Sequence, residues 1–362
     1  MEGDPSAIMI GHSWALGARR FDAKAALEVM ERVATTPRVE SSPRFWSRPG
    51  LEAYLKKGIA GGGGEGKDPV RPDKSLNGIS GTGGRSQSQT LDYSIADFAV
   101  HRLASDLGKP ELAARMLRQA QHWKAIVDAK TRRFMAGSYA ESNAEAMQFM
   151  VPHNLAGLAA SMGGAEEALR VFEEKPFSLH NEDNHYIPWA PNWFGAPWVA
   201  QRMQRHAFIR QFCILEKVPH YEWKWKPGDP LEFSKLQPKF PGGNDLGAMS
   251  SMGFFLALGI FQPITGIDGW AVGAPLTNEI TIRRGALGSL TIRTTGGEPL
   301  KPYVQSLTVN GKPWTGAWIP GELVPHGKDN VLEFTLGGEP NQQWGLEPKP
   351  PSFDAKPWYL GD

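Results

Sequence analysis

The chain has 362 residues, and its 39 Lys and Arg stand against 38 Asp and Glu, which gives a formal net charge of +1. This length allows two ordinary domains, or one large helical domain with an appendage. The near-zero net charge gives no field that would hold a nucleic acid or an acidic membrane. A single cysteine, Cys213, excludes an internal disulfide and a cysteine-rich zinc site.

The sequence carries no signal for export or for a membrane span. Residues 1–10 contain two acids and neither a basic nor an apolar signal-peptide region. The longest apolar stretch, Phe254–Phe261, is far shorter than the roughly 20 residues that a membrane span needs. We therefore expect a soluble chain without a membrane span, and the compartment stays open.

Helical periodicity dominates the chain up to residue 269. Asp22 caps a predicted helix that runs to about Ala34. A helical hairpin follows, in which one helix ends at Gly108 and Pro110 opens the next, with an apolar stripe that reaches Val127. Further helices are predicted at about 50–57, 144–149, 164–174, 197–212 and 248–258. The glycine-rich stretch between 58 and 84 predicts a loop or a disordered insertion.

Near Trp270 the pattern changes from helical to alternating. Strands are predicted around 280–282, 290–292, 307–309 and 331–336. Asn310-Gly311 is a strong signal for a two-residue hairpin turn. We therefore predict a mainly α fold, with a helical domain over residues 1–269 and a small antiparallel β unit over 270–362.

Three segments place an acid on a turn rich in Gly, Pro or Asn at the end of a helix, where a rigidly held carboxylate can still reach a pocket. They are 138–143 with Glu141, 180–189 with Glu182, and 241–247 with Asp245. The phosphate-loop, HExxH and GxSxG motifs are absent from the sequence. The acids also fit a purely structural role, because carboxylates are favoured before helices as caps and by the helix dipole.

Two further residue types in the second segment have alternative interpretations. His180 and His185 lack a third nitrogen or sulfur ligand nearby, so hydrogen bonding suits them better than a metal site. Trp189, Trp193 and Trp198 suit either stacking against sugar rings or packing in a core.

The segments together resemble the catalytic region of glycoside hydrolase family 92, whose members are calcium-dependent, exo-acting α-mannosidases. Residues 243–263 and 272–276 are similar to the family's acid before Gly-x-Met-Ser, its aromatic helix ending in Ala-Leu-Gly-Phe-x-Pro, and its Gly-Ser-Pro-Leu. Residues 181–188 resemble Asn-Glu-Pro-Ser-His-His-Ile-Pro, and 139–143 resemble Tyr-x-Glu-Gly-Asn, with Val151-Pro-His153 in register behind. The matching segments follow in the family's order from about Asp4 to Pro340.

The resemblance implies a partial (α/α)6 barrel and an inverting hydrolysis that releases mannose from the α-mannosides of glycans. It assigns Glu141 as the general acid and Asp245 as the general base. The residues that it implies for sugar contacts are Asn181, Glu182, His185 and Asn244. It also implies bound calcium, for which Asn143 and Asn184 are the candidate oxygen ligands.

The chain departs from the family pattern in several places. Asn181 stands where members selective for α-1,2 linkages have His, Ser142 replaces Gly after the acid, and Asn154 replaces the Asp that follows Pro-His. The family's amino-terminal β-sandwich and first barrel helices have no counterpart here, so we expect a truncated chain or one completed by a missing segment or a partner chain. The family is commonly exported. The rival hypothesis is an inactive remnant with a sugar-binding or structural role only, although the retained acid pair favours the enzyme.

Overall fold

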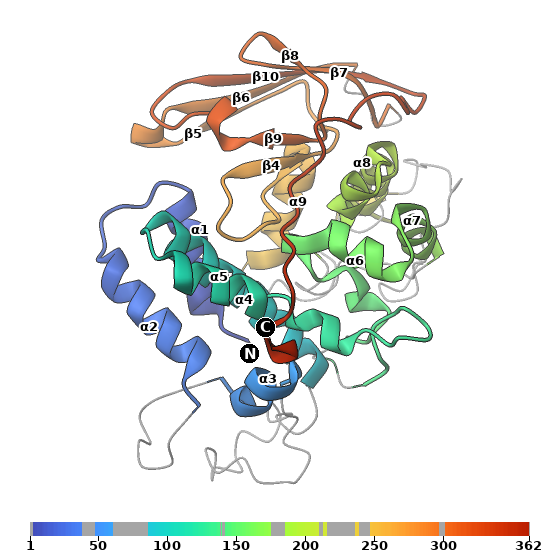
Figure 1. The fold of residues 1–362 in the computed structure, drawn as a ribbon. Helices are drawn as coiled ribbons and strands as arrows, with labels where there is room; N and C mark the ends of the chain where they lie inside the picture. The colour runs from blue at the N-terminus through green and yellow to red at the C-terminus, as the bar shows by residue number, and fades with distance from the viewer. Residues whose placement is uncertain are drawn as a thin grey trace. The chain divides into compact units, whose positions relative to one another are not determined.

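The computed structural model describes residues 3–37, 48–60, 86–137, 139, 142–174, 185–209, 213–215, 236–238, 247–296 and 301–361. The chain forms two compact units (Figure 1). Unit 1 comprises Met1–Gly157, Ile264–Ile267 and Phe353–Asp362, and unit 2 comprises Leu158–Pro263 and Asp268–Ser352. This division differs from the predicted domains 1–269 and 270–362, which stay a prediction.

Unit 1 is built from helices, several of which begin at an Asp cap or a Pro. Its α-helices are α1 (Pro5–Ala15), α2 (Ala23–Thr35), α3 (Leu51–Lys57), α4 (Ser86–Asp106) and α5 (Pro110–Gln119). The Asp22 carboxylate accepts the main-chain N–H groups of Lys24 and Ala25, which confirms the predicted cap of α2. The stripe predicted to reach Val127 is divided, because α5 ends at Gln119 and a 3-10 helix, η2 (His122–Ile126), follows.

The core of unit 1 forms around α4, which contacts α1, α2 and α5 (Figure 1). Most of its length is buried, including polar positions such as Ser94 and Asp97. By contrast α2 and α5 are amphipathic and bury one face only, as surface helices do. The apolar cluster that joins these helices contains Ala7, Leu27, Met30, Ala34, Ala96, Val100, Leu103, Ala104, Ala113 and Met116.

The remaining helices lie between residues 146 and 258. Two 3-10 helices, η3 (Ala146–Phe149) and η4 (Pro152–Asn154), precede α6 (Leu155–Met162), and α7 (Ala165–Glu174) follows. The 3-10 helix η6 (Ile187–Phe194) leads into α8 (Pro197–Ala207), which ends five residues before its predicted limit. Further along lie the short paired strands β1 (Cys213–Leu215) and β2 (Leu236–Pro238), and then α9 (Ala248–Leu258). Among the described helices, none has both the length and the apolar character to cross a membrane.

Two sheets complete unit 2. The five-stranded sheet has the order β5-β6-β10-β7-β8, and the three-stranded sheet the order β3-β4-β9. The strands are β3 (Ile260–Phe261), β4 (Gly269–Val272), β5 (Glu279–Arg283), β6 (Ser289–Thr295), β7 (Tyr303–Val309), β8 (Lys312–Trp314), β9 (Trp318–Pro320) and β10 (Asn330–Gly337). The described chain is therefore mainly helical up to Leu258 with sheets near its carboxyl end, which confirms the predicted fold class at this level.

The pairing of the larger sheet corrects one expectation. Its neighbouring strands are antiparallel as predicted, except that β10 runs parallel to β6. The reason is that β10 inserts between β6 and β7 and so interrupts a simple series of hairpins. The predicted turn is confirmed, since Asn310 and Gly311 have φ values of +50° and +76° and join β7 to β8.

Candidate active site

Most of the predicted site residues lie outside the described residues. These are Glu141, Asn181, Glu182, Asn184, Asn244 and Asp245. His185 and Asn143 are described, together with the elements that precede and follow the acids. The described geometry of the candidate site is therefore that of its flanking segments in each unit.

In unit 1 one hydrogen bond joins the two ends of the segment that contains Glu141. The side-chain oxygen of Gln148 accepts the main-chain N–H of Phe134 at 3.0 Å, which joins the two ends of residues 134–148. Within this segment the buried Tyr139 donates its hydroxyl to the carbonyl of Met135 at 2.9 Å, and burial raises the pKa of that hydroxyl. Phe134, Tyr139 and Gln148 thus have fixed places in the core.

Asn143, a predicted calcium ligand, serves as a helix cap in the structure. Its Oδ1 accepts the main-chain N–H of Ala146 at 2.9 Å, and its carbonyl accepts that of Met147 at 3.0 Å, so it starts η3. The side chain is exposed. Within the part of the chain that the structure describes, no three His, Cys, Asp or Glu residues gather in a way that could hold a metal ion.

The Val151–Asn154 stretch is buried in the core of unit 1. His153 Nε2 lies 2.9 Å from the carbonyl oxygen of Ala120, and its ring stacks on Phe98 with centroids 5.2 Å apart. Burial lowers the pKa of His153 to about 4, so the ring is neutral at pH 7 and donates from Nε2. Asn154 Nδ2 donates to Gln121 Oε1 at 2.7 Å. These residues are structural anchors, a role that the sequence pattern alone did not reveal.

In unit 2 the described part of the second segment begins at His185. Burial lowers the pKa of His185 to about 4, which leaves a half-buried, neutral imidazole. The following helix η6 is buried throughout. Trp189 stacks on Phe261 with centroids 5.6 Å apart, and Trp193 Nε1 donates to the carbonyl of Pro351 at 2.8 Å. These two tryptophans therefore pack in a core, and of the two alternatives this one holds for them.

Buried amides and one buried cation hold the stretch that resembles Gly-Ser-Pro-Leu. Asn192 Nδ2 donates to the carbonyl of Val272 at 2.9 Å, and Arg205 Nη2 donates to that of Pro275 at 3.0 Å. Burial lowers the pKa of Arg205 to about 10, yet the guanidinium stays charged at pH 7. Neither residue was among those predicted from the sequence. An Arg on the buried face of the predicted helix, beside Met203, was the available signal.

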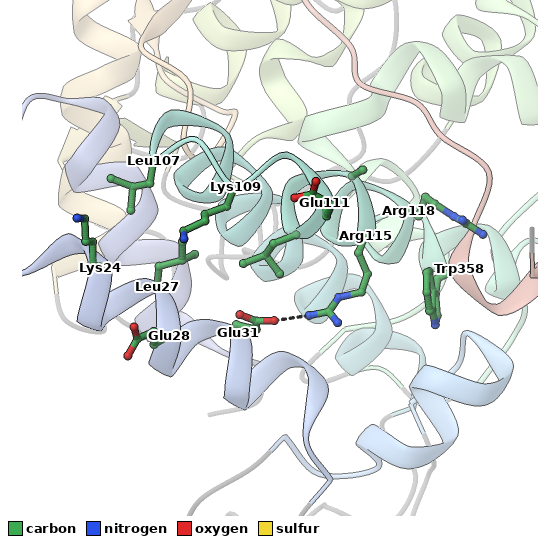
Figure 2. A pocket seen from close by; sticks show the side chains of 12 residues that line it. Lys24, Leu27, Glu28, Glu31, Leu107, Lys109, Glu111, Arg115, Arg118 and Trp358 are labelled. Carbon is green, nitrogen blue, oxygen red and sulfur yellow. Dashed lines mark hydrogen bonds and ion pairs between the residues drawn. The ribbon is translucent and has the colours of Figure 1, made fainter.

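Unit 1 also has a groove between α2 and α5 that is separate from these segments (Figure 2). Its volume is about 760 Å³, and an ion pair between Glu31 and Arg115 at 2.5 Å lies across it. The other charged residues on its walls include both signs, and Trp358 stands at one end. None of the predicted site residues lines this groove, so it is not the candidate active site.

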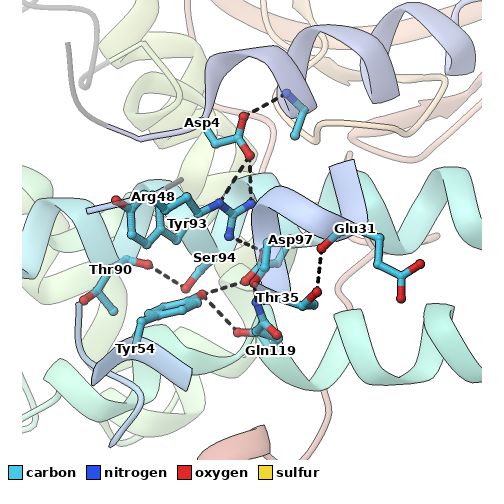
Figure 3. A network of polar contacts seen from close by, with 12 residues as sticks. Asp4, Glu31, Thr35, Arg48, Tyr54, Thr90, Tyr93, Ser94, Asp97 and Gln119 are labelled. Atoms are coloured by element: carbon cyan, nitrogen blue, oxygen red, sulfur yellow. Dashed lines mark hydrogen bonds and ion pairs between the residues drawn. The ribbon is translucent and has the colours of Figure 1, made fainter. Parts of the chain in front are cut away.

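A buried polar network lies deeper in unit 1 (Figure 3). Arg48 Nη1 contacts Asp97 Oδ1 at 2.5 Å, and Arg48 Nη2 contacts Asp4 Oδ2 at 3.0 Å. Tyr54 donates its hydroxyl to Asp97 Oδ2 at 2.8 Å, and the hydroxyl oxygen also lies 3.2 Å from the carbonyl of Gln119. All five side chains are buried. The network links α1, α3, α4 and α5, and its satisfied, inaccessible groups indicate a structural role.

Comparisons with known proteins agree with this architecture. The model of the glycosyl hydrolase family 92 catalytic domain matches residues 1–214 and 232–338. An uncharacterized secreted glycosidase of Arthroderma benhamiae is 23% identical over 320 residues, which cover 75% of this chain and 38% of that protein. Among solved structures, a family 92 α-mannosidase of Bacteroides thetaiotaomicron superposes with a TM-score of 0.76 at 19% identity, over 98% of this chain and 45% of its own.

A second solved structure from the same organism, a family 92 inverting mannosidase, gives a TM-score of 0.75 at 19% identity, with 98% of this chain and 48% of that chain covered. The chain thus spans less than half the length of each of these relatives. At this identity the structural likeness establishes the fold. Because the family model matches most of its residues, the chain belongs to glycosyl hydrolase family 92.

Proposed function

We propose that this chain is an inverting α-mannosidase that releases mannose from the α-mannosides of glycans. Glu141 is the general acid and Asp245 the general base. The observation that carries the proposal is that both acids lie within the residues matched by the family model, each inside a segment that resembles a family motif. The inactive-remnant hypothesis has no comparable observation in its favour and is left as an outcome of the experiment below.

In this mechanism the two carboxyl groups lie on opposite sides of the scissile bond. The acid protonates the leaving oxygen while the base deprotonates a water that attacks the anomeric carbon from the other face, which requires a separation of about 6.5 to 9.5 Å. A general acid needs a raised pKa and hence a partly desolvated place. The buried Tyr139, two residues before Glu141, supports such a place.

The base needs the opposite environment, because it must be ionised to accept a proton. Asp245 lies three residues before the first residue of α9, Ala248. The positive end of a helix dipole favours the charged form of a carboxylate within about one turn of the helix start. This position therefore supports Asp245 as the base.

The sugar contacts are proposed for Asn181, Glu182, His185 and Asn244. Of these, His185 is described, and its neutral ring can both donate and accept hydrogen bonds from hydroxyl groups at pH 7. Neutral, half-buried imidazole is well suited to an uncharged ligand such as a mannose residue. Asn192 and Arg205 support this region by holding Val272 and Pro275 in place.

Calcium dependence is part of the proposal because of the family resemblance. Of its two proposed ligands, Asn143 already caps η3 with its side-chain oxygen, and Asn184 lies outside the described residues. The described residues alone do not form a calcium site, and no step of the mechanism above depends on the ion. We likewise propose that the helices belong to an (α/α)6 barrel, in which the enveloped α4 is an inner helix and the amphipathic α2 and α5 are outer ones.

The decisive experiment measures mannose release from α-linked mannobioses by the purified chain, with calcium and with a chelator. Glu141→Gln should lower turnover by about 10² to 10⁴-fold and leave mannose binding intact, since the amide can no longer protonate the leaving group. Glu145→Gln, which changes an exposed acid four residues away, is the matched control and should hydrolyse normally. A folded chain that releases no mannose from any mannobiose would establish the remnant hypothesis instead.

A further inference from the structure

The groove between α2 and α5 plays no part in the proposed mechanism (Figure 2). All twelve residues that line it belong to unit 1 and are described in the structure. Its floor is the outer side of the apolar cluster of unit 1, with the buried Leu27 and the half-buried Leu107 and Leu112. Its volume of about 760 Å³ lies within the range of roughly 300 to 1,000 Å³ that ligand pockets occupy. The groove therefore has room for a ligand of several rings.

The charged side chains along the groove are of both signs, and each of the two helices contributes acids and bases. They are Lys24, Glu28, Glu31, Lys109, Glu111, Arg115 and Arg118. This near balance gives no field that would select an anion or a cation. The same groups are strong hydrogen-bond donors and acceptors, and a hydroxyl group both donates and accepts. The groove therefore suits an uncharged ligand that is rich in hydroxyl groups.

The composition of the groove disfavours a protein as its occupant. Seven of the twelve residues that line it are charged, whereas the buried centre of a protein–protein interface is depleted in charged residues. Its walls are the helices α2 and α5, whose main-chain groups are paired within each helix, so they offer no strand edge to an extended peptide. A polar ligand of smaller size fits these walls better.

One ion pair in the groove supplies a donor and an acceptor side by side. Arg115 Nη2 donates to Glu31 Oε1 at 2.5 Å across the groove (Figure 2). The side chains of Arg115 and Glu31 are 35% and 39% exposed, so a ligand can reach them. A guanidinium has five N–H donors and a carboxylate about four acceptor sites, and this contact uses one of each. Neighbouring hydroxyl groups of a sugar ring can therefore bind both partners without separating them.

An aromatic ring stands at one end of the groove. Trp358 is 39% exposed and belongs to the 3-10 helix η11 (Trp358–Leu360), which contacts α3 and α5. The Arg118 guanidinium lies over the Trp358 ring, 4.9 Å from its centroid. The next residue, Tyr359, packs against His122 with centroids 5.1 Å apart, which fixes η11 while Trp358 stays at the surface. An indole held in this way offers a planar apolar surface to the C–H face of a sugar ring, and little conformational entropy is lost on binding.

We propose that the α2–α5 groove is a second, non-catalytic binding site for a neutral oligosaccharide, in which Trp358 stacks on a sugar ring and Glu31 and Arg115 bind its hydroxyl groups. The class of ligand follows from the groove itself, which combines a stacking ring, paired donors and acceptors, and no prevailing charge. That the sugar is a mannoside rests on the proposed function. A glycan bound here stays at a raised effective concentration beside the chain while the groove takes no part in bond cleavage.

The test observes the Trp358 ring directly, by fluorine NMR on the full chain labelled with 5-fluorotryptophan. Trp358→Phe identifies its signal among those of the 13 tryptophans. Every sample carries Glu141→Gln, which under the proposed function leaves the probes intact. The probes are α-linked mannotetraose and maltotetraose, which are neutral, and tetragalacturonate, a sugar chain of similar length that is negatively charged. We expect mannotetraose to shift the Trp358 signal in a saturable way, and tetragalacturonate to leave it in place at the same concentrations.

Substitutions then test the ion pair. Glu31→Gln should weaken mannotetraose binding, measured from the Trp358 signal, by about tenfold, which is the effect of losing one charge-assisted hydrogen bond. Two exposed positions of unit 1 outside the groove are the matched controls. Leu360→Ala shortens an apolar side chain of η11, and Glu52→Gln removes the acid of another ion pair, the one with Lys56. Both control variants should bind mannotetraose as tightly as the parent protein.

Each other result has a defined meaning. A Trp358 signal that moves with neither neutral probe would overturn the site, and a shift with maltotetraose alone would overturn its assignment to mannosides. Equal shifts with tetragalacturonate would overturn the neutral ligand, and unchanged affinity in Glu31→Gln would overturn the role of the ion pair. A signal that moves with protein concentration alone would make the groove an interface between copies of the chain. If the Glu141→Gln protein hydrolyses mannotetraose, the proposed function fails instead, because the Trp358 signal reports binding and not turnover.

Discussion

A buried polar network in unit 1 and the apolar cluster beneath the larger sheet of unit 2 are held together by different interactions. In unit 1 a guanidinium, Arg48, lies between Asp4 and Asp97, and all three side chains are buried. Beneath the larger sheet of unit 2 lies a cluster of buried apolar side chains, with Leu332 and Phe334 of β10 among them. A polar core fixes the relative orientation of several helices through directed bonds, whereas an apolar core depends on volume and area.

The two kinds of core should therefore respond differently to substitutions. Removing one member of a buried ion network leaves charges without compensation, and the loss is abrupt. Removing methyl groups from an apolar core leaves a cavity, and the loss grows with its volume. The effects of substitutions on the free energy of unfolding should also depend on pH in the polar network, because it contains groups that change charge.

The largest effect is expected for Arg48→Met, which leaves Asp4 and Asp97 buried without their cation. The free energy of unfolding should fall by about 3 to 5 kcal/mol near pH 7. Burial raises the pKa of Asp97 above its ordinary value of 3.8, and loss of Arg48 raises it further. An acid whose pKa is raised by folding stabilises the folded state when protonated and loses that contribution as the pH rises through the raised value.

The loss in Arg48→Met should therefore shrink as the pH is lowered from 7 toward 3.8. Urea unfolding at several pH values in this range measures it. Arg48→Lys, which keeps a charge but loses the forked contact to both acids, is the control and should lose less. A loss in Arg48→Met that does not vary with pH would show that Asp97 does not carry it.

The matching change in unit 2 is Leu332→Ala in β10. This side chain is fully buried beneath the central strand of the larger sheet. The cavity should lower the free energy of unfolding by about 3 kcal/mol. No ionisable group changes, so the same loss is expected near pH 5 and near pH 7. A pH-dependent loss here would remove the distinction between the two cores.

A smaller effect sharpens the comparison within unit 1. Burial lowers the pKa of His122 to about 3, and the ring packs edge-on against Tyr54 and Tyr359. Between the unfolded value of 6.5 and about 3 the unfolded chain binds a proton that the folded chain does not, so acidification destabilises the fold.

His122→Phe removes this titration while keeping an aromatic ring of similar size. Relative to wild type, the variant should gain about 1 to 2 kcal/mol of stability between pH 8 and pH 5. Unfolding measured across this range checks the difference, with the unchanged stability near pH 8 as the internal control. A parallel pH dependence in variant and wild type would contradict the buried, neutral state of His122.

Local signals predicted much of the fold. The Asp22 cap, the break at Gly108 and Pro110, and the Asn310-Gly311 turn each act within a few residues, so the sequence displays them. Contacts between residues far apart in the sequence gave no such signal. Arg48 and Asp97 are 49 residues apart and meet only in three dimensions, as do β6 and β10. The return of residues 353–361 to unit 1 is of the same kind.

The candidate site shows the same limit. Spacing alone could not separate a catalytic acid from a helix cap, and Asn143, assigned to calcium by resemblance, caps η3 in the structure. The buried Trp189 and Trp193 could equally have been sugar platforms from their sequence alone. The proposed roles of Glu141 and Asp245 come from the family resemblance, because composition and periodicity alone suggest none.

The smallest effect tests whether burial, and not ion pairing as such, makes the Arg48 network sensitive. Arg293 and Glu279 pair across β6 and β5 at 3.0 Å, with 53% and 57% of their side chains exposed. Glu279→Gln should change the free energy of unfolding by less than about 0.5 kcal/mol, because water solvates either partner when the other is lost. Added salt should reduce even this difference. A loss of more than about 1 kcal/mol would mean that a solvated pair on the sheet matters nearly as much as a buried one. The sensitivity of the Arg48 network would then not be due to its burial.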